Sequence, residues 1–326
     1  MMRMTLAAGF AVAALLAATG QAAIAASGVE EGLWDTGKQG HASQETLTAD
    51  CGEGGGPRSV DNNGFCWIDD SVAVELGVKF TTSEPVAIGG IRVYRVDPGA
   101  VTGTLWSADG QKLASGTFSG STSHSWQDLE FTAPVDIMPG ESYVASYFSP
   151  SSDYAYEWGY FDGVSRSVGP LTATASIEGD RNGVFCYGTS CGLPTETYKD
   201  SNYWVTPLLW THNFSGYQQP IDTAVVNTAK AGRAIPVKFS LGGDKGLDIV
   251  RAGHPKVTQI RCEAGAATDS VEETVTSGLN TLKYNASADT YTYGWKTKKS
   301  WSGSCVKFEL GLNDWSSHTF TVKFAK

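Results

Sequence analysis

Residues 102–118 read TGTLWSADGQKLASGTF, and this stretch points to the fold class. Runs containing Thr, Leu, Trp and Phe lie on both sides of Ala108-Asp109-Gly110. Asp-Gly between two extended runs favours a β-hairpin, because glycine adopts the positive φ that the tight turn requires. The stretch therefore predicts two antiparallel strands.

Similar short runs of β-branched and aromatic residues continue along the chain, and helical periodicity is scarce after residue 26. Pro207 lies within one of these runs and is expected at an edge or a bulge, because proline cannot donate a ladder hydrogen bond. The strands expected in the first module are residues 75–80, 88–96, 103–108, 142–148 and 202–210. The pattern predicts an all-β protein whose first module is a jelly-roll-like β-sandwich.

Residues 211–222, THNFSGYQQPID, show no periodicity and mark the expected module boundary. We expect a signal peptide at 1–26, the jelly-roll-like sandwich at 27–211 and an immunoglobulin-like sandwich at 212–326. In the second module, residues 279–283 are expected to pair with 291–296 as a hairpin.

Residues 1–26 begin with a positive charge at Arg3, continue with an apolar Ala-rich run and end in small residues. Ala23-Ile24-Ala25 fits a small-x-small cleavage site, so the segment predicts a secretory signal peptide. A membrane anchor is the alternative, for which the run is short. We therefore expect a secreted, extracellular or cell-wall-associated protein with no membrane span after signal cleavage.

Six cysteines agree with export, because an even number in an exported chain indicates disulfides. Zinc is the alternative, but the sequence contains no CxxC pair. Several pairings are possible, and order along the chain favours Cys51–Cys66, Cys186–Cys191 and Cys262–Cys305.

The net charge of −10 is unevenly distributed. Residues 27–212 contain 9 Lys and Arg against 24 Asp and Glu, whereas residues 213–326 contain 14 against 10. An acidic first module would repel phosphate, which argues against nucleic acid as a partner. It is compatible with neutral sugars or with Ca²⁺.

Seven segments of the first module, in order, carry a family resemblance: ELGVKF (75–80), GIRVYR (90–95), TGTLWSADGQKLASGTF (102–118), PGESYVASYF (139–148), GYF (159–161), NGV (182–184) and PTETYKDSNYWV (194–205). On these segments, residues 32–211 resemble domain of unknown function 4082. Residues 213–326 resemble the family named for its Pro-x-Lys-Phe motif, here Pro236-Val237-Lys238-Phe239. Both resemblances imply exported bacterial β-sandwich modules, and neither brings an established activity. Members of the first family commonly carry histidines where this chain has Val101 and Asp153, which weakens an inherited metal role.

Catalytic motifs are scarce: there is no HExxH, and none of the five histidines lies in a triad-like context. The remaining enzymatic route is a carboxylate pair, as in glycosidases. Asp153, Glu157 and Asp162 border an aromatic stretch, and Asp69-Asp70 follow Trp67. A structural calcium site is a separate possibility, since jelly-roll sugar-binding modules use loop carboxylates for this purpose. Its candidate ligands are Asp35, Asp69, Asp70 and Glu75; alternatively, Asp35 caps a turn and Glu75 is an ordinary strand residue.

The aromatic stretch is YFSPSSDYAYEWGYF, residues 147–161, with seven aromatic residues in fifteen. Tyr154, Tyr156 and Trp158 fall at alternate positions, so an extended chain places them on one face, all exposed or all buried. Exposed, they would offer rings to the C–H faces of a sugar, with Asp153 and Glu157 as polar neighbours. Buried, they would be one wall of a core.

Three functions compete. The first is a non-catalytic binding module for carbohydrate or cell-wall glycan, with Tyr154, Tyr156, Trp158, Asp153 and Glu157 as its ligand site. The second is a structural or adhesive surface protein that binds other proteins through strand edges or the Cys51–Cys66 loop. The third is a carboxylate-dependent glycan hydrolase. The absence of a recognised catalytic constellation favours the first, and we expect no enzyme activity.

Overall fold

The computed structural model describes residues 32–33, 51, 58–118, 123–189, 191–262, 268–270 and 281–326. Within these residues the regular structure is β-strand, apart from one turn of 3-10 helix, η1 (Lys299–Trp301). The prediction of an all-β fold is confirmed. The expected signal peptide and Asp35 lie outside the described residues.

The largest sheet of the first module has the strand order β10-β11-β3-β8-β5-β6, and β12 pairs with both β3 and β13. The hairpin expected at Asp109-Gly110 is confirmed, since β5 and β6 pair antiparallel across it. The strands are β3 (Val74–Thr82), β5 (Val101–Ser107), β6 (Lys112–Phe118), β8 (Tyr143–Ser149), β10 (Arg166–Val168), β11 (Leu171–Ala173), β12 (Val184–Tyr187) and β13 (Glu196–Thr197).

A second sheet has the order β14-β4-β7, formed by β4 (Val86–Arg95), β7 (Ser125–Ile137) and β14 (Val205–Leu209). Pro207 lies in β14, an edge strand, as its missing N–H requires. A small third sheet, β1-β2-β9, is formed by β1 (Arg58–Val60), β2 (Cys66–Asp69) and β9 (Asp153–Tyr156).

The core of the first module lies between the large sheet and the β14-β4-β7 sheet. Alternate residues of β3, such as Leu76 and Phe80, are buried there together with Ile91 and Val93 of β4. Burying such a side chain contributes about 1.5–3 kcal/mol, so this alternation holds the two sheets together. Gly90 is also required by packing, because a Cβ at this position would overlap the carbonyl oxygen of Leu129.

The second module also consists of two sheets, with the orders β15-β17-β21-β20 and β18-β22-β23-β16-β19. The expected hairpin is confirmed by the pairing of β20 with β21, although β20 begins at Leu282. The strands are β15 (Tyr217–Gln218), β16 (Val226–Lys230), β17 (Ala234–Phe239), β18 (Lys256–Ile260), β19 (Thr268–Ser270), β20 (Leu282–Asn285), β21 (Thr290–Lys296), β22 (Cys305–Gly311) and β23 (Ser317–Ala325).

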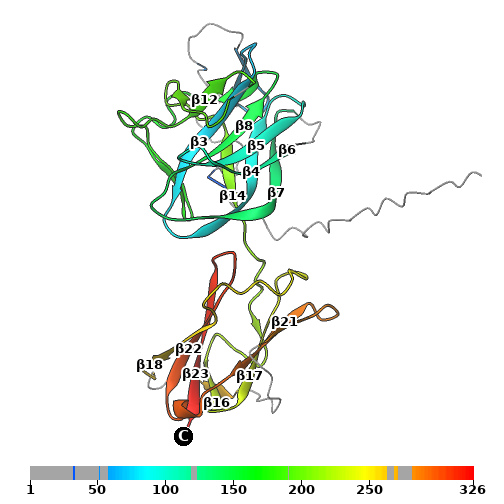
Figure 1. The fold of residues 1–326 in the computed structure, drawn as a ribbon, viewed down its shortest axis with the longest axis vertical. Coiled ribbons are helices and arrows are strands. Elements are labelled where there is room, and N and C mark those ends of the chain that lie inside the picture. The colour runs from blue at the N-terminus through cyan, green and yellow to red at the C-terminus, as the bar shows by residue number, and fades with distance from the viewer. Residues whose placement is uncertain are drawn as a thin grey trace, which may run out of the picture.

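The Pro-x-Lys-Phe motif lies in β17. Val237 and Phe239 are fully buried, while the intervening Lys238 is only partly buried. Figure 1 shows the two groups of sheets, blue to green for the first module and yellow to red for the second. Their buried apolar residues form separate clusters, one ending near Leu209 and the other including Phe214.

Disulfides join Cys51 to Cys66, Cys186 to Cys191 and Cys262 to Cys305. This is the pairing that order along the chain favours. By the chain-entropy model, the first contributes about 3 kcal/mol. Each bridge closes its loop within one module.

Candidate functional site

Seven aromatic rings of the first module form a continuous series of contacts, which we call the aromatic row. Neighbouring ring centroids lie 5.2–6.5 Å apart, and all contacts except Tyr156–Trp158 are edge-to-face. Such contacts stabilise a fixed arrangement of rings beyond their buried area. In spatial order the row is Tyr187, Phe185, Tyr203, Tyr154, Tyr156, Trp158 and Tyr198.

The row is exposed at its ends and buried at places in its middle. Tyr187 is 45% exposed and Tyr198 is 48% exposed, whereas Tyr203 and Tyr156 are buried. Tyr154 and Trp158 are partly buried. The expectation that Tyr154, Tyr156 and Trp158 share one degree of exposure is therefore wrong.

The reason lies in the local backbone. Strand β9 ends at Tyr156, where Cys66 of β2 lies opposite, and the Tyr156 hydroxyl donates to the Cys51 carbonyl oxygen at 3.1 Å. Trp158 follows in a turn, and its side chain is freed from the strand alternation. Tyr156 supports the row from within and does not belong to its accessible surface.

A carboxylate is held between two rings of the row. Asp70 accepts a hydrogen bond from the Tyr154 hydroxyl at 3.0 Å and another from the Tyr187 hydroxyl. Burial, followed by the bond to Asp70, raises the pKa of Tyr187 to about 12, so this hydroxyl keeps its proton at neutral pH. Asp70 thus places a fixed acceptor beside exposed aromatic surface, the combination that a sugar hydroxyl and its neighbouring C–H face require.

At the other end of the row, a lysine lies over the tryptophan. The Lys199 Nζ is 3.7 Å from the Trp158 ring centroid and 5.3 Å from that of Tyr198. A cation over an aromatic face at this distance is attracted by the ring quadrupole. Trp158 also packs against the hydrophobic core, so it is both a structural residue and one rim of the exposed surface.

Glu157 and Asp153 flank the partly buried rings. Burial raises the pKa of Glu157 to about 7, and the charge of Arg166 opposes this shift. Burial also raises the pKa of Asp153, with the charge of Asp69 as the next cause. The backbone of Glu157 exchanges two 2.9 Å hydrogen bonds with Asn202, which anchors the aromatic row to the segment before β14.

One family comparison bears on this site. Residues 62–205 match the model of DUF4082, a domain of unknown function. The match contains all seven residues of the aromatic row. No curated protein matches the chain. The resemblance of residues 213–326 to the Pro-x-Lys-Phe family is supported by no family match and stays a prediction.

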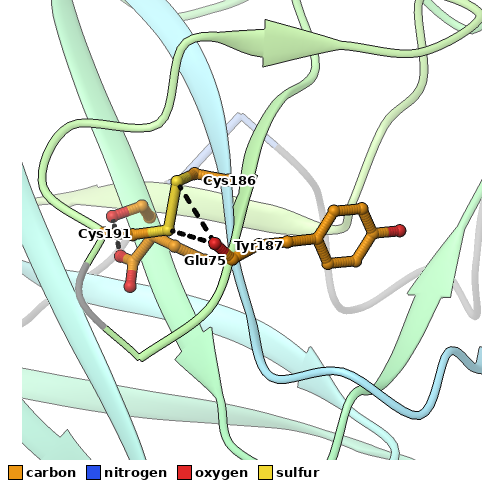
Figure 2. The surroundings of a disulfide bond; sticks show 5 residues. Glu75, Cys186, Tyr187 and Cys191 are labelled. Carbon is orange, nitrogen blue, oxygen red and sulfur yellow. Dashed lines mark hydrogen bonds between the residues drawn. A yellow bond between two sulfur atoms is a disulfide. The ribbon is translucent and has the colours of Figure 1, made fainter.

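Glu75, in the DUF4082 region, lies beneath a loop closed by a disulfide. It is 6% exposed and faces Cys186 across strands β3 and β12. Figure 2 shows the Glu75 carboxylate on the disulfide side of β12, while the Tyr187 ring extends away from both. Neighbouring strand residues point to opposite faces of a sheet. Glu75 therefore lies on the same face as Cys186, and Phe185 and Tyr187 of the aromatic row point to the other face.

Glu75 belongs to a buried polar chain. Trp106 Nε1 donates to Ser146 Oγ at 2.7 Å, and Ser146 Oγ donates to Glu75 Oε1 at 2.5 Å. Burial raises the pKa of Glu75 to about 7, against the opposing effects of Ser146 and of the Lys112 charge. Leu193, which follows the disulfide loop, packs against the small apolar cluster that contains Trp106.

The candidate calcium ligands are engaged separately. Glu75 is bound by Ser146, and Asp70 by two tyrosines, while Asp69 accepts from the Ser71 backbone N–H at 3.1 Å. In the part of the chain that the structure describes, no group of three His, Cys, Asp or Glu residues is suited to a metal ion. Asp35 lies outside that part. Of the two interpretations of Glu75, a strand residue fits its place in β3.

His124, one of the five histidines, lies beside a carboxylate. Its Nδ1 lies 3.1 Å from Asp61 Oδ2, which also accepts from the Tyr94 hydroxyl at 2.5 Å. The same carboxylate accepts from the backbone N–H groups of Asn63 and Phe65. These contacts are those of a turn-capping aspartate, and they tie residues 61–65 to the start of β7.

A serine motif of the kind found in hydrolases follows Tyr187 in the chain. Residues 188–192, GTSCG, have the spacing of GxSxG, which in hydrolases places a serine on a turn between a strand and a helix. Here the motif follows β12 and lies in the loop closed by Cys186–Cys191, and the next element is strand β13. Residue 190 lies outside the described residues. Among the described residues, the motif therefore lacks the strand–turn–helix context of a nucleophilic serine.

Sequence reasoning missed four members of the row and its lysine: Phe185, Tyr187, Tyr198, Tyr203 and Lys199. They lie far from residues 147–161 in the chain, and only tertiary contacts bring them together. The one available signal was the position of Tyr187 inside a short cysteine loop.

Proposed function

We propose that this chain is a secreted or cell-surface, non-catalytic protein that binds carbohydrate, with a polysaccharide or cell-wall glycan as its ligand. Three disulfides are compatible with an extracellular location, and no helix among the described residues is long and apolar enough to cross a membrane. The proposed site is the accessible part of the aromatic row: Tyr187, Tyr154, Trp158 and Tyr198, with Asp70 and Glu157.

The observation that carries the proposal is the pairing of exposed rings with a fixed acceptor. Sugars bury C–H faces on Tyr and Trp rings and need hydrogen-bonding partners for their hydroxyls. Tyr187 and Tyr198 supply exposed rings, and Asp70 supplies an oriented carboxylate between Tyr187 and Tyr154. Because edge-to-face contacts hold the row, little ordering cost remains for a ligand.

Asp153 begins β9, and Glu157 follows its last residue. Glu157 directly precedes Trp158 and is partly buried beside the row. We assign Glu157 a role in ligand contact.

Binding to another surface protein is the second candidate, and one observation favours it. Strand β18 lies at the edge of its sheet, and Lys256, Thr258, Gln259 and Ile260 are exposed. An open edge can accept a further strand from a partner. The β18 edge contains no aromatic residue, so we place protein binding second.

The test is retention of residues 27–326 on insoluble cellulose, chitin and purified bacterial cell wall. We expect wild type to be retained on at least one of them and Trp158→Ala to be released, since the variant loses the ring between Tyr156 and Tyr198. Ile177→Ala is the matched control, because Ile177 is 63% exposed, apolar and outside the row.

Folding of each variant is checked by its unfolding midpoint. Retention of Trp158→Ala at the wild-type level would contradict the site. Failure of wild type to be retained on any of the three materials would contradict the glycan proposal and leave the β18 edge as the surface to test.

A further inference from the structure

The face of Trp158 carries a cation supplied by the chain itself. Lys199 Nζ lies 3.7 Å from the Trp158 centroid, within van der Waals contact, and it is also within reach of Tyr198. The Lys199 side chain is exposed. Its ammonium is therefore placed over the rings without being enclosed, and another cation can replace it there.

The backbone around Lys199 is strained in a way that aims the side chain. Lys199 has φ +49° and Asp200 has φ +51°, two consecutive left-handed residues that are not glycine. Such conformations are unfavourable and persist only where neighbours impose them. Here Gly159 N donates to Lys199 O at 2.7 Å, and Phe161 N donates to Asp200 O at 3.0 Å.

Arg181 completes the restraint, since its guanidinium donates to both carboxylate oxygens of Asp200 at 3.0 and 3.1 Å. The turn therefore presents Lys199 to Trp158 as a built feature of the fold.

The charge of the whole module also bears on the ligand. Residues 27–212 carry 24 acidic against 9 basic side chains. This balance attracts cationic ligands to the module and repels polyanions, so uronic-acid polymers and teichoic-acid phosphates are disfavoured. At this end of the row the charges are mixed, because Glu157 precedes Trp158 while Arg166 acts on Glu157 and Arg181 binds Asp200.

We propose that the Trp158–Tyr198 end of the row binds a protonated amine carried by a glycan, such as a partly deacetylated amino-sugar polymer. The ligand ammonium takes the position over Trp158 that Lys199 occupies in the free protein. This inference rests on the proposed glycan-binding function and names its ligand class. It also assigns Lys199 as an internal competitor for the site.

The test uses residues 27–326 and two soluble probes of equal length: glucosamine oligosaccharides with free amines and the same oligosaccharides fully N-acetylated. Binding is measured by calorimetry at a pH where the amines are protonated. We expect tighter binding of the amine-bearing probe. We expect Lys199→Ala to bind this probe roughly two- to fivefold more tightly than wild type, because the competing ammonium is gone. Lys199→Arg keeps a competing cation, and a guanidinium stacks well on an aromatic face, so this variant is not expected to gain affinity for the probe.

Trp158→Phe separates ring recognition from general charge attraction. Phenylalanine keeps an aromatic face but attracts cations more weakly than tryptophan, so the preference for free amines is expected to shrink. A preference that persists unchanged in Trp158→Phe and Lys199→Ala would overturn the inference, since it would then come from net charge alone.

The outcomes also separate this inference from the proposed function. Equal binding of both probes, or binding of the N-acetylated probe alone, overturns the amine preference and leaves glycan binding standing. Binding of neither probe overturns the amine preference as well, while the retention assay on insoluble glycans decides the broader proposal independently.

Discussion

Asn182→Ala is expected to lower the free energy of unfolding of the first module by about 3–5 kcal/mol. Asn182 is fully buried, and its side chain replaces backbone pairing at a gap along β3. Its Oδ1 accepts from Lys79 N at 2.8 Å and from Gly183 N at 2.7 Å. Its Nδ2 donates to Lys79 O at 2.9 Å and to Thr174 O at 2.8 Å.

The gap arises because β11 pairs with β3 only from Phe80 onward and β12 only as far as Gly77. The Asn182 amide therefore serves the peptide groups of Lys79, which neither strand reaches. Alanine would leave these groups unpaired and add a cavity.

Denaturant unfolding followed by tryptophan fluorescence measures the effect. Asn182→Asp is the informative companion, because it keeps the volume but turns a carboxylate toward two carbonyl oxygens. It is expected to be at least as destabilising as alanine. Thr195→Ala, at an exposed position, serves as the neutral control. An alanine variant within about 1 kcal/mol of wild type would contradict this role.

Glu75→Gln is expected to make the protein more stable above neutral pH by about 2–3 kcal/mol and to change little in mild acid. Burial raises the pKa of Glu75 from 4.5 to about 7 in the folded state. Between these values the unfolded chain loses the proton while the folded chain keeps it. The folded state binds more protons, so its stability falls as pH rises from about 4.5 to about 7.

Glutamine fits the same site, because its amide oxygen accepts from Ser146 without a charge to bury. The measurement is the difference in unfolding free energy between wild type and variant across this pH window. Glu157 titrates in the same window but is present in both proteins, so the difference isolates Glu75. Glu196→Gln, at an exposed carboxylate, is the control. A difference that stays constant across the window would contradict the buried-carboxylate account.

Much of the fold follows from local sequence. The Asp109-Gly110 turn and the alternating strands around it specify a hairpin through local interactions. Pro207 lies in an edge strand because proline has no N–H to donate to a ladder. Cysteine order also predicts the disulfides, because each bridge closes a loop within one module.

The sequence predicted only part of the candidate site. Period two is consistent with Tyr154 and Tyr156 in one strand, but it cannot show that Cys66 of β2 pairs with Tyr156 or that β9 ends there. Tyr187 and Tyr198 come from later segments, and only tertiary contacts bring them into the row. Exposure depends on such non-local pairing, so sequence spacing alone cannot predict it.

The central claim is that the aromatic row is one glycan-binding surface. Its most direct test is to measure how each of the two exposed ends contributes to the affinity for one ligand. Tyr187→Ala, Tyr198→Ala and the double variant are titrated with soluble fragments of the polysaccharide that retains wild type. We predict that each single variant weakens binding of long fragments roughly two- to tenfold and that the double variant weakens it further. Wild-type affinity in both single variants, with the ligand still bound, would show that the glycan binds elsewhere and would contradict the account.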